Sequence, residues 1–521
     1  MKKNLLLTML TMLLCIFGAQ ATWAQGITTA FINGKVVDEK GEGIPGATVV
    51  AVHEPSGSQY ATATLNDGRF NLPNVRIGGP YTIKASFVGT KDQTIDNLFL
   101  SLGQTYTANF ELAENSTELQ EVVVSGLKDP IFNSDRTGAG TNITSSQLSN
   151  MPTISRNFTD MTRLVPQSSG TSFAGRNNRY NNLTIDGSLF NNAFGLASLP
   201  GGQTESQPIS LDALEEIQVN VAPYDVRQGG FTGAAINAVT RSGTNEFSGS
   251  AYYFTRNQSL VGQRVSGNEI PVDNFNFSQV GMRVGGPIIK NKLFFFASGE
   301  LERRNDPFGN FVANRGTDGA NVSLVNGTAA DGLADFLRGR GYDPGPLDGY
   351  QAETGSDKLL ARLDWNINNN HRLTVRYNFL QSKRDVPASG SGSQGGRANS
   401  RNSLPFRNGN YIINNNYNSV VAELNSTFGN KFSNNLIIGW TGFRDFRDTP
   451  GGVYPFVDIE NGSNQQAVAF GNELFSVNNL LNQDVFQFTN NFNVYLGKHT
   501  LTFGTSNEYY RFENGFMPSF N

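Results

Sequence analysis

Apolar and polar side chains alternate residue by residue through the C-terminal half of this 521-residue chain. The clearest run starts at His371: one face carries Leu373, Val375, Tyr377 and Phe379, and the other carries Arg372, Thr374, Arg376 and Asn378. The same pattern recurs over 359–367 and 486–496. Two-faced strands of this kind occur in soluble sandwiches and in membrane barrels. Runs of about ten residues favour the barrel.

The connections between these runs differ in length in a regular way. Short turns fall at Asn366–Asn370, Gly429-Asn430 and Gly497-Lys498, whereas long polar insertions fall at Asn305–Ser356 and Asp385–Asn410. In outer-membrane barrels the short turns face the periplasm and the long loops face outward. After residue 24 no apolar run is long enough to span a bilayer as a helix. Membrane residence would therefore require a closed barrel.

The N-terminus has the organisation of a secretory signal peptide. Lys2 and Lys3 precede an apolar run from Leu5 to Phe17, and small residues lead to an expected cleavage after Ala24. An uncleaved membrane anchor is the less favoured alternative, because the run is short for a spanning helix. The single cysteine, Cys15, lies within residues 1–24, so no disulfide is expected in the mature chain.

Residues 31–113 are predicted to form a small antiparallel β-domain. Gly- and Asp-containing turns separate five predicted strands: Ile32–Asp38, Ala47–His53, Tyr60–Leu65, Tyr81–Phe87 and Tyr106–Leu112. The stretches Gly34-Lys-Val-Val-Asp, Gly43-Ile-Pro-Gly-Ala-Thr-Val and Asn66-Asp-Gly-Arg-Phe resemble, in this order, the carboxypeptidase-regulatory-like β-sandwich. This module has no catalysis of its own. Asp38, Glu54 and Asp67 are interpreted as turn and surface residues, because their spacing is not that of a calcium loop.

A polar linker over 114–127 contains one segment with strong β-propensity, Glu121-Val122-Val123-Val124-Ser125. Such a strand could add to the edge of a partner's sheet. Taken alone, the segment is better interpreted as the first strand of the next domain.

Residues 128–242 mix short helices and strands, as an α/β domain does. Helices are predicted over Ser145–Met151, capped by Thr144 or Ser145, and over Arg156–Leu164. Asn182-Leu-Thr-Ile is predicted as a strand that ends in a turn at Asp186-Gly187, and Leu211–Val221 as a short helix followed by a strand.

The glycine-rich stretch that follows makes the resemblance specific. Leu183-Thr-Ile-Asp186-Gly187, then Arg227, Gly229-Gly230, Gly233-Ala-Ala-Ile-Asn237 and Thr240-Arg241-Ser-Gly, is similar to the plug of TonB-dependent receptors. The order β-domain, strand, plug, barrel resembles that of receptors from Bacteroidetes-type bacteria. Val284-Gly-Gly-Pro-Ile-Ile-Lys-Asn-Lys-Leu-Phe-Phe-Phe resembles the Oar-like branch. With a plug behind it, Glu121–Ser125 is favoured as a TonB box.

The resemblance implies a mainly β fold: an N-terminal β-sandwich, an α/β plug domain over 128–242, and a transmembrane β-barrel from 243 onward. It implies an outer-membrane location, a TonB-type energiser as partner at Glu121–Ser125, and uptake of an unknown ligand, either a sugar, a peptide or a chelate. A surface lipoprotein is left open as a further partner. Ligand contacts are expected from plug loops around 173–180 and 191–203, including Phe173, Arg176, Tyr180 and Phe194. Arg227 and Arg241 either pair with carboxylates of the barrel lumen or are ordinary surface charges.

About nine membrane strands can be counted after the plug, which is fewer than the resemblance requires. A barrel of eight strands is filled by its own side chains, and a plugged lumen goes with about 22. The sequence is therefore expected to be the N-terminal portion of a receptor, with a partial barrel.

Other function classes find little support. The three histidines, His53, His371 and His499, are scattered without metal-ligand spacing, and no phosphate loop or nucleophile elbow is present. No enzyme, cofactor or metal is therefore expected, and a net charge of −4 gives no footprint for nucleic acid. Two alternatives remain: an Oar-like outer-membrane protein acting in export or surface contact, and a secreted adhesin made of β-domains.

Overall fold

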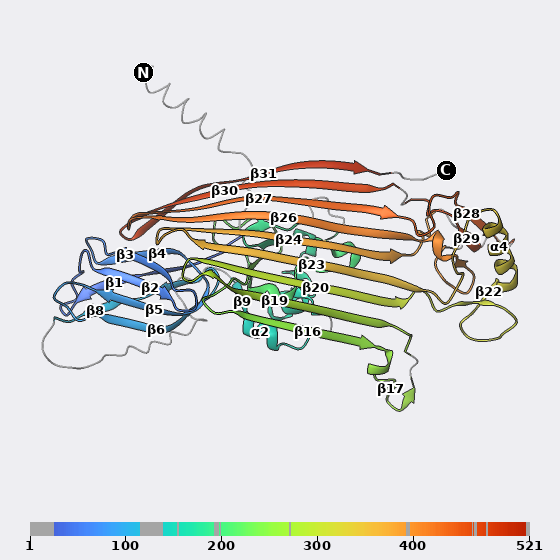
Figure 1. Ribbon diagram of the computed structural model, residues 1–521, viewed down its shortest axis with the longest axis horizontal. Coiled ribbons are helices and arrows are strands. Elements are labelled where there is room, and N and C mark those ends of the chain that lie inside the picture. Colours follow the sequence, from blue (N-terminus) through green and yellow to red (C-terminus); the bar gives the residue numbers. More distant parts are fainter. Residues whose placement is uncertain are drawn as a thin grey trace, which may run out of the picture.

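The chain divides into three parts in the computed structural model, with the N-terminal β-domain at one end of a large sheet and a middle region packed against one face of that sheet (Figure 1). It describes residues 26–114, 139–153, 156–191, 197, 199–269, 272–391, 396–460, 462, 466–475 and 478–516. The predicted signal peptide over 1–24, the TonB-box-like strand Glu121–Ser125 and the loop residue Phe194 lie outside these residues. The parts are an N-terminal β-domain, a middle region (139–242) and a large sheet.

The N-terminal β-domain is a sandwich of two four-stranded sheets. One has the order β4-β1-β7, with β8 also paired to β1, and the other has the order β3-β2-β5-β6. The strands are β1 Ala30–Asp38, β2 Thr48–His53, β3 Ser58–Ala63, β4 Arg69–Val75, β5 Gly78–Ser86, β6 Gln93–Leu100, β7 Thr105–Thr107 and β8 Phe110–Leu112. Their inward side chains, among them Ile32, Val49, Phe70 and Tyr81, form one core.

Two strands of this domain were not predicted, and one predicted strand is divided. β4 and β6 carry several outward polar side chains, and β6 is an edge strand with half of its residues exposed, so their apolar signal is weak. The predicted strand Tyr106–Leu112 is wrong as a single element. It forms two short strands, because the Asn109 Oδ1 accepts a hydrogen bond from the Lys35 backbone nitrogen at the break.

The middle region is built on a five-stranded sheet of order β13-β12-β15-β14-β9. Its helices are short. The predicted Arg156–Leu164 helix is a single α-helical turn followed by a 3-10 segment, η1. The elements are β9 Ala139–Thr144, α2 Ser145–Asn150, α3 Phe158–Met161, η1 Thr162–Leu164, β10 Ser168–Ser169, β11 Ser172–Phe173, η2 Asn178–Tyr180, β12 Asn182–Ile185, β13 Ser188–Leu189, η3 Gly202–Thr204, η4 Leu211–Ala213, β14 Leu214–Val221 and β15 Ala235–Thr240. β12 and β15 are parallel neighbours, which brings the two halves of the glycine-rich motif together.

The large sheet contains nine antiparallel strands in the order of the sequence. They are β16 Ser248–Asn257, β19 Asn276–Ile289, β20 Leu293–Pro307, β23 Gln351–Asn366, β24 His371–Val386, β26 Tyr411–Phe428, β27 Phe432–Asp448, β30 Leu480–Leu496 and β31 His499–Gly515. Short turns lie at the end beside the N-terminal β-domain, and long connections lie at the other end (Figure 1). This arrangement confirms the mainly β fold class predicted from the sequence.

The predicted alternation holds along these strands. On β23, Leu359 and Leu363 are exposed, whereas Lys358 and Leu360 are buried against the middle region. We call the face that meets the middle region the inner face and the opposite one the outer face. Exposed residues of the outer face are mostly large and apolar, among them Val420, Ile438, Phe486 and Phe488. No helix in the described ranges is long and apolar enough to cross a membrane.

The long connections, expected as polar insertions, contain secondary structure of their own. Segments of 308–350, 396–410 and 449–475 pack into a cap with its own hydrophobic core, which includes Leu337, Tyr342, Phe406 and Phe470. Its elements are β21 Val312–Asn314, β22 Val322–Asn326, α4 Gly327–Gly339, β25 Leu404–Pro405, η6 Arg407–Gly409, β28 Val457–Glu460 and β29 Gln466–Phe470. A small hairpin, β17 Arg264–Val265 with β18 Asn268–Glu269, and the turn η5 Gln258–Leu260 complete this end.

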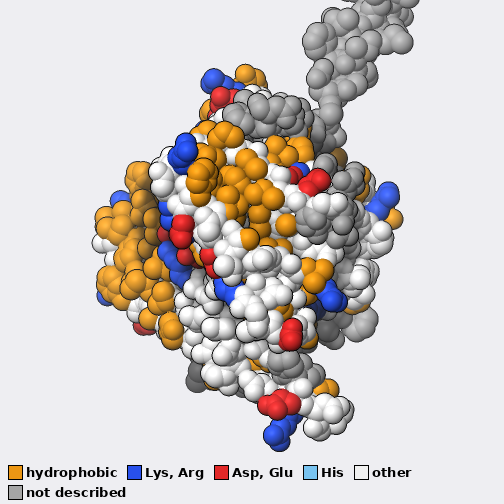
Figure 2. Space-filling model, turned by 90° about the vertical axis from the view of Figure 1, so that its right-hand side faces the viewer, with side chains coloured by type: hydrophobic (Ala, Val, Ile, Leu, Met, Phe, Trp, Pro, Cys, Tyr) orange, Lys and Arg blue, Asp and Glu red, His pale blue; other side chains and the backbone are white. Residues whose placement is uncertain are grey.

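The end of the molecule that carries the cap is shown face-on in Figure 2. Charged side chains are scattered over it. Hydrophobic side chains gather along one side of the molecule and, separately, over its upper part.

Candidate functional site

The contact between the middle region and the inner face of the large sheet centres on Asp186. This residue begins the tight turn between β12 and β13, where Asp186 and Gly187 both have positive φ values of 45° and 74°. That conformation suits a two-residue hairpin turn. A side chain at Gly187 would also come within 2.7 Å of the Ile437 Cδ1 atom on β27, so glycine lets the turn approach the sheet closely.

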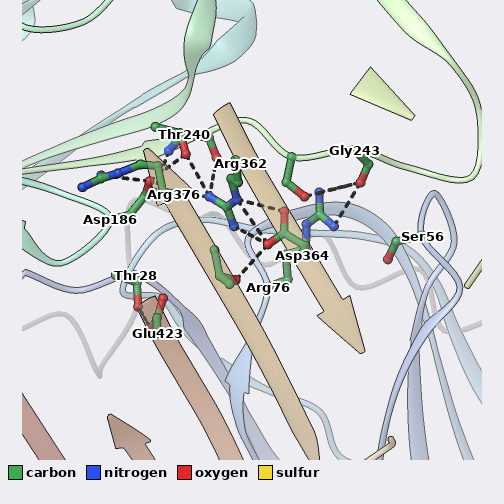
Figure 3. Close-up of polar contacts among 12 residues, drawn as sticks. Thr28, Ser56, Arg76, Asp186, Thr240, Gly243, Arg362, Asp364, Arg376 and Glu423 are labelled. Atoms are coloured by element: carbon green, nitrogen blue, oxygen red, sulfur yellow. Dashed lines mark hydrogen bonds and ion pairs between the residues drawn. The ribbon is translucent and has the colours of Figure 1, made fainter. Parts of the chain in front are cut away.

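Two arginines of the large sheet hold the Asp186 carboxylate (Figure 3). Arg376 on β24 lies 3.1 Å from Asp186 Oδ2 and also donates to the Ile185 carbonyl oxygen. Arg362 on β23 lies 3.3 Å from Oδ1 and donates to the Thr240 carbonyl oxygen at 2.9 Å. Thr240 donates to the same carboxylate through its backbone nitrogen and its hydroxyl.

This cluster is almost completely shielded from solvent. The side chains of Arg376, Asp186 and Arg362 are 1%, 5% and 10% exposed. Arg362 forms a second ion pair with Asp364, its neighbour on β23, at 2.8 Å. Removing one member of a buried pair leaves an uncompensated charge, which is strongly destabilising. The cluster therefore fixes the middle region to the sheet.

Two further carboxylates of the middle region pair with arginines of the sheet. Asp212 lies 3.1 Å from Arg283 on β19. Glu205 lies 2.9 Å from both Arg304 on β20 and Arg384 on β24. Across the described residues, every ion pair between the middle region and the sheet thus has its acid on the middle region and its arginine on the sheet.

The N-terminal β-domain closes the short-turn end of this arrangement. Arg372 of β24 stacks on the Tyr60 ring at 3.6 Å and donates to the Gln59 carbonyl oxygen. Arg76 reaches the Gly243 carbonyl oxygen where the middle region joins the sheet (Figure 3). Ahead of β1, Thr28 donates to Glu423 on the inner face at 2.7 Å. The domain is therefore anchored to both other parts.

Glu216 on β14 is the buried link between the N-terminal β-domain and the middle region. It is 4% exposed and accepts hydrogen bonds from the Leu102 backbone nitrogen at 3.0 Å and from Asn142 at 2.7 Å. Gln218 donates to the Leu102 carbonyl oxygen at 2.6 Å. Burial raises the pKa of Glu216 to about 7, although these two hydrogen bonds act in the opposite direction.

Deprotonation of the buried Glu216 should therefore make the folded state less stable as pH rises. A raised pKa in the folded state means that stability is greatest below pH 4.5, the unfolded value, and is lost as pH rises through about 7. The shift corresponds to about 3 kcal/mol, because one pKa unit corresponds to about 1.4 kcal/mol. Thermal unfolding of the wild type and of Glu216→Gln between pH 5 and 8 measures it. The variant should have the shallower pH slope, and equal slopes would contradict the assignment.

The two arginines singled out from the sequence pair within the middle region instead of with the sheet. Arg227 bonds to Asp225 two residues away, at 2.8 Å, and Arg241 lies 3.5 Å from Glu215. The sequence left open whether they pair with carboxylates of the lumen or are ordinary surface charges, and in the structure a carboxylate of the same region pairs with each of them. In the ion pairs between the two parts, the middle region supplies the carboxylates and the large sheet supplies the arginines.

The glycines of the motif lie in the loop between β14 and β15. Asn182 donates to the Gly229 carbonyl oxygen at 3.0 Å, and the neighbouring Gly230 has a positive φ. A side chain at Gly233 would come within 2.2 Å of Asn181 Oδ1. Asn237 accepts a hydrogen bond from Thr184 at 2.9 Å, so these residues hold β12 beside β15. The motif builds the sheet that positions Asp186.

The residues expected to face a ligand differ in their exposure to solvent. Phe173 is fully buried in the core of the middle region, so the expectation that it contacts ligand is wrong for this structure. Arg176 and Tyr180 are exposed. Of the second loop, Gln203 lies against the sheet near the cap, where it contacts Asp445 and Arg447.

Sequence reasoning missed Arg283, Arg304 and Arg384 as partners of the middle region. The alternation places Arg362 and Arg376 on the polar face of their strands, which indicates that their side chains point inward. A strand pattern cannot show which carboxylate lies opposite an inward arginine. No group of three or more potential metal ligands occurs within the described residues. The arrangement is that of a polar contact between two bodies, with hydrogen-bonded charges in place of a reaction centre.

Comparisons with known proteins agree with this geometry. The family described as "Outer membrane beta barrel domain" matches residues 239–329 and 346–520, just over half of the chain. The chain belongs to this outer membrane β-barrel family. This protein therefore resides in the outer membrane, with the large sheet as part of its barrel wall. The family "Carboxypeptidase regulatory-like domain" matches residues 31–113 of the same β-barrel protein.

Individual relatives of this β-barrel protein are transporters. It is 26% identical over 378 residues to "TonB-dependent transporter Oar" of Myxococcus xanthus, a match that covers 69% of this chain and 34% of that relative. The outer membrane transporter YddB of Escherichia coli has a similar fold, with a TM-score of 0.51 and 14% identity, covering 71% of this chain and 48% of that one. The chain thus spans about a third of the length of the curated relative and about half of the solved structure.

Proposed function

We propose that this protein acts as a TonB-dependent transporter of the outer membrane, with the middle region as a plug inside the barrel. The observation that carries the proposal is the buried contact of Asp186 with Arg362 and Arg376. A body held in a barrel by a few charged contacts blocks the lumen at rest. It can be loosened when those contacts are broken from outside.

The location of the protein supports an external energy source. The outer membrane has no ATP beside it, and its porins prevent an ion gradient. Energy must therefore arrive by contact from the inner membrane. The segment Glu121–Ser125 has a sequence of strong β-propensity that could pair with the edge of an energiser's sheet. It lies in the chain directly between the N-terminal β-domain and β9, the edge strand of the plug sheet.

Because β9 is an edge strand, a pull on the preceding segment acts first on its pairing with β14. Asn142 of β9 also bonds to Glu216 and to the Leu102 carbonyl oxygen, which belong to the docked N-terminal β-domain contact. Displacing β9 would therefore loosen the plug sheet and the domain beneath it together. A ligand bound on the outer side, near the loop around Gln203, could then pass.

Deletion of Glu121–Ser125 should abolish binding of the full-length protein to the purified periplasmic domain of the energiser. The measurement is a pull-down or calorimetric titration with detergent-solubilised receptor. The matched control deletes five other residues of the same linker, Asn115–Leu119, and should retain binding. Undiminished binding after deletion of Glu121–Ser125 would show that this segment is not the TonB box.

The second candidate function keeps the same fold but changes its direction, with the protein acting in export or surface contact. The folded cap favours it, because a structured outer surface with exposed apolar residues such as Leu324, Phe336 and Val453 could contact another cell or protein. Export predicts that loss of the protein causes a solute to accumulate in the periplasm. Uptake predicts that the solute accumulates outside.

A further inference from the structure

Five arginines of the inner face contact the plug at different positions along the strands. Arg362 and Arg376 lie towards the short turns, four residues before the end of β23 and five after the start of β24. Arg283 lies near the middle of β19. Arg304 and Arg384 lie within three residues of the strand ends that lead into the long connections. In the register of the sheet, Arg283 is level with Leu360, two residues from Arg362, whereas Arg304 and Arg384 both pair with Thr354. The arginines therefore occur at two levels of the barrel wall, one in the middle and one near the long connections.

Three of these arginines depend on the plug for their counter-charge. Among the described residues, Arg283, Arg376 and Arg384 each pair with one carboxylate, which belongs to Asp212, Asp186 or Glu205 of the plug. Arg304 and Arg362 also pair with Asp306 and Asp364 of their own strands. If the plug is displaced, Arg283 and Arg376 at the middle level and Arg384 near the long connections each lose their only carboxylate partner among the described residues.

Arg376 has hydrogen-bonding capacity that the plug does not use. It is 1% exposed, yet its Nε and one of its amino groups have no hydrogen-bond partner within the described part of the chain. A buried N–H group without an acceptor is costly, and a guanidinium is suited to bind an oxyanion through two parallel hydrogen bonds. This side chain therefore has donors for an acceptor beyond Asp186.

The other charged residues of the inner face do not neutralise the three arginines that would lose their plug carboxylates. Lys358 is neutralised by Glu300 at 2.6 Å and contacts Glu302. Three inner-face carboxylates have no ion pair among the described residues: Glu423 bonds to Thr28 and Asn435, Asp445 bonds to Asn415 and Gln203, and Glu508 bonds to Tyr510. None of them pairs with the three arginines that the plug would release.

We propose that the transported solute is an anion whose carboxylate-type groups replace Asp186, Asp212 and Glu205 on the arginines as the plug moves. The inference rests on the proposed transport function. Arginine-lined passages favour anions, because uncompensated positive charge in a narrow, poorly solvated path attracts them and repels cations. The plug carboxylates therefore occupy the binding positions of the solute while the transporter is at rest.

The test uses two hydrophilic β-lactam probes of similar size, one anionic and one with a net positive charge. A β-lactamase in the periplasm reports their entry into cells that carry the full-length protein. Asp186→Asn, Glu205→Gln and Asp212→Asn are combined to free the arginines. The anionic probe should then enter several-fold faster than with the wild type, whereas entry of the cationic probe should change little.

A second set of variants removes the selectivity. Adding Arg283→Gln, Arg376→Gln and Arg384→Gln should equalise the two entry rates. Arg303→Gln is the matched control, because this arginine is exposed on β20 and pairs with Asp357 of the sheet. It should leave the preference for the anion unchanged.

Glu205→Gln alone provides a milder opening, because its carboxylate is 46% exposed and its loss should not impair folding. Faster entry of the anionic probe in this variant supports the proposal. Equal entry of both probes through the opened variants would overturn the charge selectivity but keep a passage. Entry of neither probe, with normal amounts of protein in the outer membrane, would overturn the transport function itself.

Discussion

Replacing Asp186 with asparagine should lower the free energy of unfolding of the middle region, the proposed plug, by about 3–5 kcal/mol, the usual cost of removing one partner from a buried pair. The loss is large because two arginines share this carboxylate. Arg376, at 1% exposure, has no other carboxylate partner among the described residues. Asparagine keeps the size and part of the hydrogen bonding, so the change isolates the charge.

Urea denaturation of the purified protein, with the plug followed by its sensitivity to protease, measures the loss. Asp225→Asn is the matched control, because Asp225 also pairs with an arginine of the plug but in a partly exposed position. Its effect should stay near the 0–1 kcal/mol typical of surface pairs. The double variant Asp186→Asn with Arg376→Met should regain part of the stability, because it also removes the unpaired charge. Equal effects of Asp186→Asn and Asp225→Asn would exclude the anchoring role.

Replacing Ile438 with arginine should prevent stable insertion of the barrel. Ile438 is 52% exposed on the outer face of β27 and is paired to Phe488 on β30. It lies midway between Phe432 at the short turn and Arg444 towards the long connections. A charged residue on the lipid face costs about 2–4 kcal/mol near the bilayer midplane and about 0–1 kcal/mol near its edges.

The measurement is the amount of folded protein in the outer-membrane fraction, judged by its heat-modifiable migration in electrophoresis. Phe432→Arg is the depth control and should accumulate nearly normally, because position 432 adjoins the short turn at residues 429–431. Ile438→Leu should behave as the wild type. Normal accumulation of Ile438→Arg would mean that this face does not contact lipid. That result would favour the secreted-adhesin interpretation.

The faces of the membrane strands could be predicted because their alternation needs only local sequence. Position 359 was assigned to the apolar face and position 362 to the polar face, and the structure agrees. The N-terminal β-sandwich followed from turn residues and motif order. The edge strand β6 was missed because half of its residues are exposed and it has adjacent polar residues at Asp96 and Asn97, which interrupt the alternation.

The partners within the candidate site could not be predicted, because they come from distant parts of the chain. Asp186 and Arg376 are 190 residues apart in sequence. Their contact depends on how the plug sits in the sheet, which a strand pattern does not encode. The motif did identify Asp186, but as a turn residue. For the same reason the sequence assigned Arg227 and Arg241 no fixed partner, and the structure gives each a nearby carboxylate.

The folded cap has a consequence for how the long-connection end of the large sheet responds to changes in its sequence. Segments from three separate connections share one apolar interior around Tyr342, Phe406 and Phe470. Local packing couples them, so a disturbance felt by one segment is transmitted to the other two. The three connections therefore behave as one packed unit, and an insertion into any one of them would alter the shape of the whole cap.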